Sequence, residues 1–435
     1  MPNLKLKIIS LVLTLLALSA LLWWRSVDVN KTTVDIIIKD AKILTMNDVG
    51  EIIDNGWLVI DNGTIRAIDS NVCCGNYHAN EVIDAQGKIL IPGLINTHGH
   101  IGMSSLRNVD NSHKLQEWLI NTGEIEKSFT EEDVYNNSKI GIEEMLRNGI
   151  TTFNDMYFFP EQTIKAAEEL GIRAMVRIPT LRDQNDSLQI DQVFYEKYIN
   201  DSLISFNLAP NPLTEYSLNE LRWFSSKAKE LNIPIHIHLA EDPSADQEIF
   251  EKFNLTPLEL LKQSGLISNK LIIAHAITFS EAEIQELAQH SNISISFNPK
   301  SNYLLSDRTA PIDLYLQNKV TAGIGTDGTA SSGTLDILDQ IRFASLVSRC
   351  NSILEFCIDQ RQISPYTWIK MTTIDGTKAL GLDKTTGSIE IGKEADLIVI
   401  DTKNYEDLVY TTNSSNVSEV IIDGKIIIRN KNWAK

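Results

Sequence analysis

LINTHGH, at residues 94–100, is the first of eight apolar segments that decide how this chain folds. The other seven lie at residues 150–157, 172–178, 204–210, 233–241, 270–276, 293–299 and 320–328. Helical stretches such as TEEDVYNNSKIGIEEMLRN separate most of them. Alternating strands and helices predict an α/β fold, and eight such units in one block predict a (β/α)8 barrel of the TIM type. A doubly wound open sheet is the alternative, but no glycine-rich phosphate fingerprint follows the first strand.

The two ends of the chain carry strand patterns. Residues 33–91 alternate or run apolar, and a hairpin turn of the Asn-Gly type lies at residues 61–63. Residues 385–435 repeat the pattern around a turn at residues 423–424. We therefore expect a small β-sandwich formed from both termini, with the barrel at residues 92–384 between its two parts.

The first 30 residues have a different composition. An unbroken apolar run, IISLVLTLLALSALLWW at residues 8–24, follows Lys5 and Lys7 and precedes Arg25. Such a run is typical of a secretory signal or of a short membrane-spanning helix. We expect a hydrophobic helix that anchors the protein in a membrane, with the catalytic domain outside the cytoplasm by the positive-inside rule. Export after cleavage of a signal is one alternative, and a buried helix of the fold is another.

Charge and composition narrow the choice of partners. The 435 residues include 57 acidic and 39 basic side chains, which gives a net charge of −18. Because neutralising phosphates requires clustered Lys and Arg, this balance argues against a nucleic acid partner. Four cysteines are too few for a disulfide framework in a chain of this length. No motif indicates an organic cofactor.

Histidines mark the ends of several predicted strands. His98 and His100 lie two residues apart on the first strand, so their side chains point to the same side of the sheet. His238, His275 and Asp327 lie at the ends of three later strands. In a barrel of this type the C-terminal strand ends carry the chemistry. Three histidines and a carboxylate suit one divalent metal per chain, zinc first and iron second, with one position left for water.

One carboxylate follows a histidine of this group closely. Glu241 lies three residues after His238 in the sequence HLAE. Beside a metal it could carry a proton from water to a leaving nitrogen. The alternative interpretation is a solvated acid in a surface loop.

Several longer motifs occur in one order along the chain. They are PGLINTHGH at residues 92–100, TTFNDMYF at 151–158, HIHLAE at 236–241, NPKSN at 298–302, TDGTAS at 326–331 and GSIEIGKEADLIVID at 387–401. Together they resemble the amidohydrolase superfamily, and within it the branch of methylthioadenosine and S-adenosylhomocysteine deaminases. Guanine deaminases and triazine hydrolases are neighbours of that branch. The resemblance covers nearly everything after residue 33.

The resemblance implies a role for each residue at a matching position. The implied metal ligands are His98, His100, His238 and Asp327, and the implied catalytic residues are Glu241 as proton shuttle, His275 and Asp327. The implied enzyme hydrolyses carbon–nitrogen bonds other than peptide bonds, in cyclic amidines, by adding hydroxide to a ring carbon and expelling ammonia. We therefore expect deamination of a purine-like heterocycle. The alternatives are hydrolysis of another C–N or C–halogen bond, as in triazine hydrolases, and a non-catalytic binding module.

The substrate-binding part of the sequence departs from the family pattern. In APNPLTEYS, at residues 209–217, Asn211 stands where the family has a histidine that contacts the purine. Asparagine donates and accepts hydrogen bonds but cannot carry a charge. Glu126 matches an acid that holds ribose hydroxyls, and Trp118 and Arg177 are further candidates for contact with a small heterocyclic substrate. Dimers are common among the proteins that the chain resembles, which implies a homodimer as one option.

Overall fold

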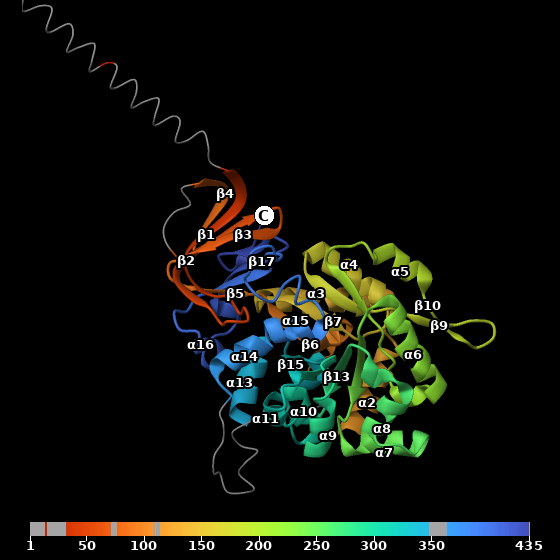
Figure 1. The fold of residues 1–435 in the computed structure, drawn as a ribbon. Coiled ribbons are helices and arrows are strands. Elements are labelled where there is room, and N and C mark those ends of the chain that lie inside the picture. The colour runs from red at the N-terminus through yellow and green to blue at the C-terminus, as the bar shows by residue number, and fades with distance from the viewer. Residues whose placement is uncertain are drawn as a thin grey trace, which may run out of the picture.

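The structure is a computed structural model of the chain. It describes Thr14 and residues 32–70, 76–107, 109, 114–347 and 363–434. Figure 1 shows two parts: a barrel and, at one side of it, a sheet to which both ends of the chain contribute.

Eight parallel strands form the barrel. They are β6 (Leu94–Gly99), β7 (Ile150–Asp155), β8 (Arg173–Arg177), β11 (Ile204–Asn207), β12 (Ile235–Leu239), β13 (Leu271–His275), β14 (Ile293–Phe297) and β15 (Thr321–Ile324). Hydrogen bonds join the first four and the last four into two groups. Parallel bridges between Leu208 and Ile235 and between Gly99 and Asp327 close the circle. The predicted TIM-type barrel is confirmed, and the open sheet is excluded.

Register in the barrel decides which side chains face its interior. Ile237, Ile273 and Ile295 are aligned on β12, β13 and β14, and all three belong to the large apolar core shared with the surrounding helices. Because side chains alternate along a strand, the other row of β12 faces the interior. That row contains His236 and His238.

Helices cover the outside of the barrel and connect its strands. They are α2 (Leu115–Glu126), α3 (Glu131–Arg147), α4 (Pro160–Leu170), α5 (Gln192–Tyr198), α6 (Leu218–Leu231), α7 (Pro243–Phe253), α8 (Pro257–Ser264), α9 (Glu281–Leu287), α10 (Pro299–Ser306), α11 (Ile312–Gln317), α12 (Thr329–Ser332), α13 (Ile337–Val347), α14 (Pro365–Met371) and α15 (Ile374–Leu380). Helix α3 illustrates why these segments are helical. Thr130 and Asp133 form a capping box at its start, and Val134, Ile142 and Met145 are buried along one face.

Both ends of the chain build one further sheet. Its strands are β1 (Thr32–Leu44), β2 (Ile52–Asp61), β3 (Thr64–Asp69), β4 (Tyr77–Asp84) and β5 (Ile89–Pro92), followed by β16 (Leu397–Ile400), β17 (Val417–Ile422), β18 (Lys425–Arg429) and β19 (Asn432–Trp433). Antiparallel pairing of β5 with β16 joins the two halves. The strands that were predicted to form a sandwich are therefore joined by hydrogen bonds into one continuous nine-stranded sheet. Ile38, Leu90 and Leu397 share its core.

A buried ion pair links the barrel to this sheet. Arg173, at the start of β8, donates from Nε to Asp396 at 2.9 Å, and the same guanidinium group contacts Glu394. Arg173 and Asp396 are both buried. Because a buried charge without its partner is strongly destabilising, the pair fixes how the barrel and the sheet pack together.

The hydrophobic helix predicted for residues 1–30 lies outside the described residues, apart from Thr14. In the ranges that the structure does describe, every helix is too short or too polar to cross a membrane.

Candidate active site

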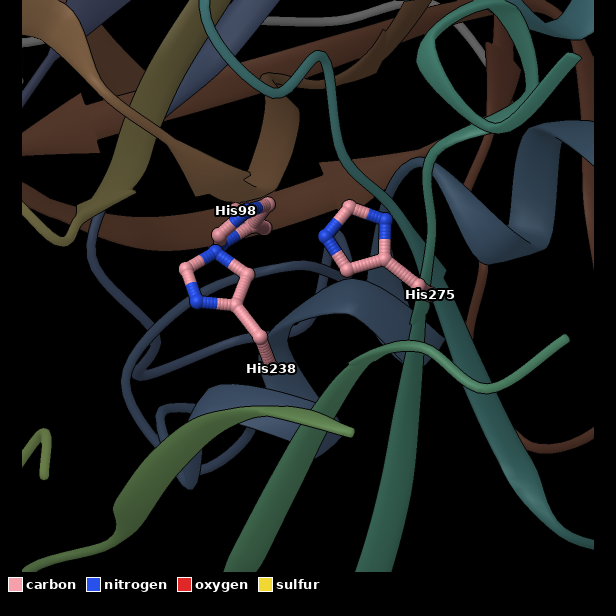
Figure 2. Close-up of side chains that lie close together, drawn as sticks. All are labelled: His98, His238 and His275. Carbon is pink, nitrogen blue, oxygen red and sulfur yellow. The ribbon is translucent and has the colours of Figure 1, made fainter. Parts of the chain in front are cut away.

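The predicted metal and catalytic residues meet at the C-terminal ends of the barrel strands. His98 lies on β6, His238 lies on β12, and β13 ends at His275. Figure 2 shows these three imidazoles pointing toward one another from their separate strands. His238 and His275, together with His100 and Asp327, line a pocket of about 520 Å³. The pocket thus opens where barrels of this type carry their chemistry.

Nitrogen and oxygen atoms converge in this group. His98 Nε2 lies 3.3 Å and His100 Nε2 lies 3.2 Å from Asp327 Oδ1. His238 Nε2 lies 3.3 Å from His100 Nε2. The potential ligand atoms of His98, His100 and Asp327 all lie within 4.8 Å of one another, and so do those of His98, His238 and His275.

The hydrogen bonds behind the rings show which nitrogens face the site. His100 Nδ1 lies 2.7 Å from the carbonyl oxygen of Met156, so Nδ1 donates. His238 Nδ1 lies 2.8 Å from Asn211 Oδ1 and donates likewise. When both rings are neutral, their Nε2 atoms present lone pairs to each other, and His98 Nε2 is buried with no hydrogen-bond partner among the described residues. Burial lowers the pKa of His100 but its hydrogen bond to Asp327 outweighs this and raises the pKa to about 9, so a bound metal would have to displace the proton of His100 Nε2. Facing lone pairs beside a carboxylate are the donor set of a divalent cation, so these residues fit a metal.

Two serine hydroxyls orient the carboxylate of Asp327. Ser301 donates to Oδ2 at 2.5 Å, and Ser331 donates to the same oxygen at 3.2 Å. The backbone N–H of Gly328 donates to Oδ1 at 2.9 Å. Neither serine was predicted as a site residue from the sequence, although both lie in quoted motifs, NPKSN and TDGTAS.

A buried hydrogen-bond chain lies behind His98. Its Nδ1 is 2.9 Å from His236 Nε2, and His236 Nδ1 is 3.1 Å from Asn154 Nδ2. Asn207 in turn donates to Asn154 Oδ1 at 2.8 Å. Burial lowers the pKa of His98 to about 4, so its imidazole is neutral near pH 7. A neutral imidazole is the form that binds a metal.

Glu241 lies beside this group in the same pocket. Its Oε1 is 3.5 Å from His275 Nε2, and His275 Nδ1 is 2.8 Å from Asn302 Oδ1. Burial raises the pKa of Glu241 above its usual range. A raised pKa favours the protonated form of Glu241, which is the form that can deliver a proton.

The pocket brings together all four substrate-binding candidates: Trp118, Glu126, Arg177 and Asn211. Trp118 Nε1 and Arg177 Nε are buried and have no hydrogen-bond partner within the described ranges. Glu126 accepts a hydrogen bond from the hydroxyl of Tyr157 at 2.6 Å, and burial raises the pKa of Glu126. Tyr157 was missed, although it lies in the motif TTFNDMYF. The two unpartnered N–H groups are donors that a polar heterocycle could engage.

A closed barrel with histidines and an aspartate at its C-terminal strand ends is the architecture of a metal-dependent hydrolase. Comparisons with known proteins agree. The model of the amidohydrolase family matches residues 89–427. The 5'-deoxyadenosine deaminase of Methanobrevibacter smithii is 36% identical over 91% of this chain and 93% of its own. A 5-methylthioadenosine/S-adenosylhomocysteine deaminase of Acetivibrio thermocellus is 32% identical over 91% and 94%.

Solved structures give the same picture. A zinc-bound adenosine deaminase from Xanthomonas campestris superimposes with a TM-score of 0.84, at 26% identity, over 93% of this chain and 95% of the other. A guanine deaminase from C. acetobutylicum shares the fold, with a TM-score of 0.77 at 21% identity over 90% and 99%. The chain belongs to the amidohydrolase family. It is an enzyme that uses a divalent metal to hydrolyse a carbon–nitrogen bond other than a peptide bond.

The comparisons also correct the location predicted from the first 30 residues. The curated relatives are named as nucleoside deaminases and align over 91% of the chain. These relatives contradict the prediction of a membrane-anchored or exported enzyme. An apolar run with flanking lysines is a compositional signal, and composition alone does not establish where a protein resides.

Proposed function

We propose that this chain is a zinc-dependent deaminase that hydrolyses the amino group of an adenosine-type purine nucleoside. One observation carries the proposal: the Nε2 atoms of His100 and His238 lie 3.3 Å apart, with both Nδ1 atoms bound on the other side of the ring, in a pocket that Glu241 also lines. The names of the relatives, which are deaminases of 5'-deoxyadenosine and of methylthioadenosine and S-adenosylhomocysteine, support the same substrate class.

The metal would be held by three imidazoles and one carboxylate: His98, His100, His238 and Asp327. Neutral imidazoles with one carboxylate suit zinc first and iron second. When bound, such an ion lowers the pKa of a water molecule enough for hydroxide to be available near pH 7. Ser301 and Ser331 hold Oδ2 of Asp327, so that Oδ1 faces the histidines.

Three side chains of this chain would manage the protons. Asp327 accepts the proton of the attacking water, and Glu241 delivers a proton to the ring nitrogen next to the attacked carbon. A C–O bond forms, the C–N bond to the amino group breaks, ammonia leaves with the proton that Asp327 accepted, and the remaining hydroxyl proton returns to Glu241. His275, whose Nε2 lies 3.5 Å from Glu241 Oε1, would orient the attacking water by accepting a hydrogen bond at Nε2, because its Nδ1 donates to Asn302 Oδ1. The amidine of the ring thereby becomes a cyclic amide.

Four pocket side chains would hold the nucleoside. Trp118 offers an apolar ring for stacking, and its N–H is unpartnered. Glu126, steadied by Tyr157, would accept hydrogen bonds from ribose hydroxyls. Arg177 and Asn211 supply further N–H donors to the heterocycle.

The rim of the pocket favours an uncharged 5′ end. Leu119, Pro212 and Glu248 are the exposed residues among those that line the pocket. Two are apolar, and the third is an acid that would repel a phosphate. We therefore expect nucleosides with small apolar 5′ groups to react faster than nucleotides.

The test is ammonia release by the zinc-loaded full chain, with Glu241→Gln as the control. The panel would contain 5'-deoxyadenosine, methylthioadenosine, S-adenosylhomocysteine, adenosine, adenosine 5'-phosphate, guanine and a chlorinated triazine. Ammonia from a nucleoside, abolished in the variant, would support the proposal. Chloride release from the triazine, with silence on every nucleoside, would replace it with hydrolysis of a C–halogen bond. A folded, zinc-loaded chain inactive toward all of them would contradict both.

A further inference from the structure

Three imidazoles at the site form hydrogen bonds through Nδ1, each with a different kind of partner. His98 is held by His236 inside the barrel, and His100 is held by the backbone carbonyl of Met156. His238 is held by the side chain of Asn211, which follows β11 and lies in the pocket. In this set, Asn211 is the partner whose side chain both contacts a metal-site histidine and faces the substrate pocket.

We propose that Asn211 is a positioning residue for His238 and thereby sets the affinity of the site for its metal. The inference rests on the proposed metal site. Asn211 Oδ1 accepts from His238 Nδ1 at 2.8 Å, which leaves Nε2 unprotonated and turned toward His100 Nε2. An acceptor behind a histidine ligand fixes its tautomer and ring orientation and raises the basicity of the nitrogen that binds the metal.

An amide side chain at position 211 can bond His238 and the substrate at the same time. An asparagine that accepts through its oxygen keeps two N–H donors on the same group. A histidine at position 211 would have only one remaining nitrogen after bonding His238. Asn211 can therefore hold His238 through its oxygen and still present a donor to a ring nitrogen or a ribose oxygen of the substrate. The chain departs from the family pattern at a position that serves both the metal site and the pocket.

The neighbouring strand supplies a matched control. His275 Nδ1 lies 2.8 Å from Asn302 Oδ1, which is the same arrangement as that of His238 and Asn211. The rings of His238 and His275 are stacked with centroids 5.2 Å apart. In the proposed site His238 binds the metal and His275 does not. Loss of the two asparagines should therefore have different consequences.

The experiment measures the zinc dissociation constant by competition with a chelating dye, for wild type, Asn211→Ala, Asn211→Asp and Asn302→Ala. Loss of such a partner weakens metal binding by about 10- to 100-fold, and we expect this for Asn211→Ala. Asn211→Asp keeps an acceptor and should bind zinc at least as tightly as wild type. Asn302→Ala should keep the wild-type zinc affinity and lose kcat. Thermal unfolding of the zinc-free proteins shows whether each variant is folded.

Several outcomes would overturn the inference. One is wild-type zinc affinity in folded Asn211→Ala, and another is an Asn211→Asp protein that binds zinc as weakly as the alanine variant. If Asn211→Ala does not fold, the affinity of Asn211→Asp decides, and a weakening of about tenfold or more refutes the role. A wild-type chain that binds no divalent metal would overturn the proposed function and this inference together. Zinc binding that is indifferent to position 211 would overturn the inference alone.

Discussion

Replacement of Glu241 by glutamine isolates the proposed proton transfer. Glutamine keeps the shape of the side chain and can still form hydrogen bonds, but it cannot carry the proton. General acid–base catalysis contributes about 10²- to 10⁴-fold to a rate, or about 2.7–5.4 kcal/mol at 1.36 kcal/mol for each factor of ten. Asp327 cannot replace the missing carboxyl group, because Ser301 and Ser331 hold it against the histidines. We therefore expect a loss of kcat in the upper part of that range.

The assay is steady-state ammonia release from the best nucleoside of the panel, with bound zinc measured in each sample. Burial of Glu241 disfavours its charged form, so the Gln variant should unfold at the same or a higher urea concentration than wild type. This control separates loss of chemistry from loss of fold. A zinc-loaded Glu241→Gln enzyme whose kcat stays within about tenfold of wild type would refute the assigned role.

Four further predictions concern the metal, the interface, a buried acid and the rim. Removal of the metal with a chelator should abolish activity and lower the unfolding midpoint, because a ligand bound only to the folded state stabilises that state. Added zinc should restore both, and full activity after chelation would contradict the metal site. Arg173→Met should lower the free energy of unfolding by about 3–5 kcal/mol in urea titrations, because Asp396 would be left buried without its cationic partner; a change below about 1 kcal/mol would show that the pair does not stabilise the interface. Burial raises the pKa of Asp336 to about 6, so the folded state binds the carboxyl proton more tightly than the unfolded state does. The stabilisation of the folded state by this proton is therefore fully present below about pH 4 and is lost as the pH rises through 6. Asp336→Asn should thus gain up to about 3 kcal/mol on wild type between pH 4 and 7, and parallel stability curves would contradict the shift. Glu248→Lys should raise the activity with adenosine 5'-phosphate relative to that with 5'-deoxyadenosine, and an unchanged ratio would remove Glu248 from the specificity argument.

The barrel was predictable from the sequence because its signal is repeated. Each of the eight apolar segments overlaps one observed strand, starting with LINTHGH, which becomes β6 (Leu94–Gly99). The gathering of His98, His238 and His275 followed from topology alone, since parallel strands in a barrel end at the same rim. No side-chain contact had to be known for that step.

The contacts behind these residues were not predictable. Ser301 lies 26 residues from Asp327, and Tyr157 lies 31 residues from Glu126. Such pairs depend on how loops after different strands return across the barrel, and hydrophobic periodicity says nothing about loops. From the sequence, Asn211 is a candidate for substrate contact at a position that departs from the family motif. Its bond to His238 could not be predicted, and it adds the proposed support of the metal site to that role.

Three non-glycine residues at the rim of the barrel have a left-handed backbone conformation. His275, Ala276 and Asp327 adopt φ values of 76°, 52° and 59°, in the left-handed region that non-glycine residues rarely occupy. Each such residue costs on the order of 1–3 kcal/mol and persists only where the surrounding structure determines it. The closed barrel supplies that surrounding structure. These turns place the Asp327 side chain beside His98 and the His275 side chain beside Glu241, where the hydrolysis is proposed to occur. At His275 and Asp327, the left-handed backbone is thus part of how the fold holds the two side chains in the proposed site.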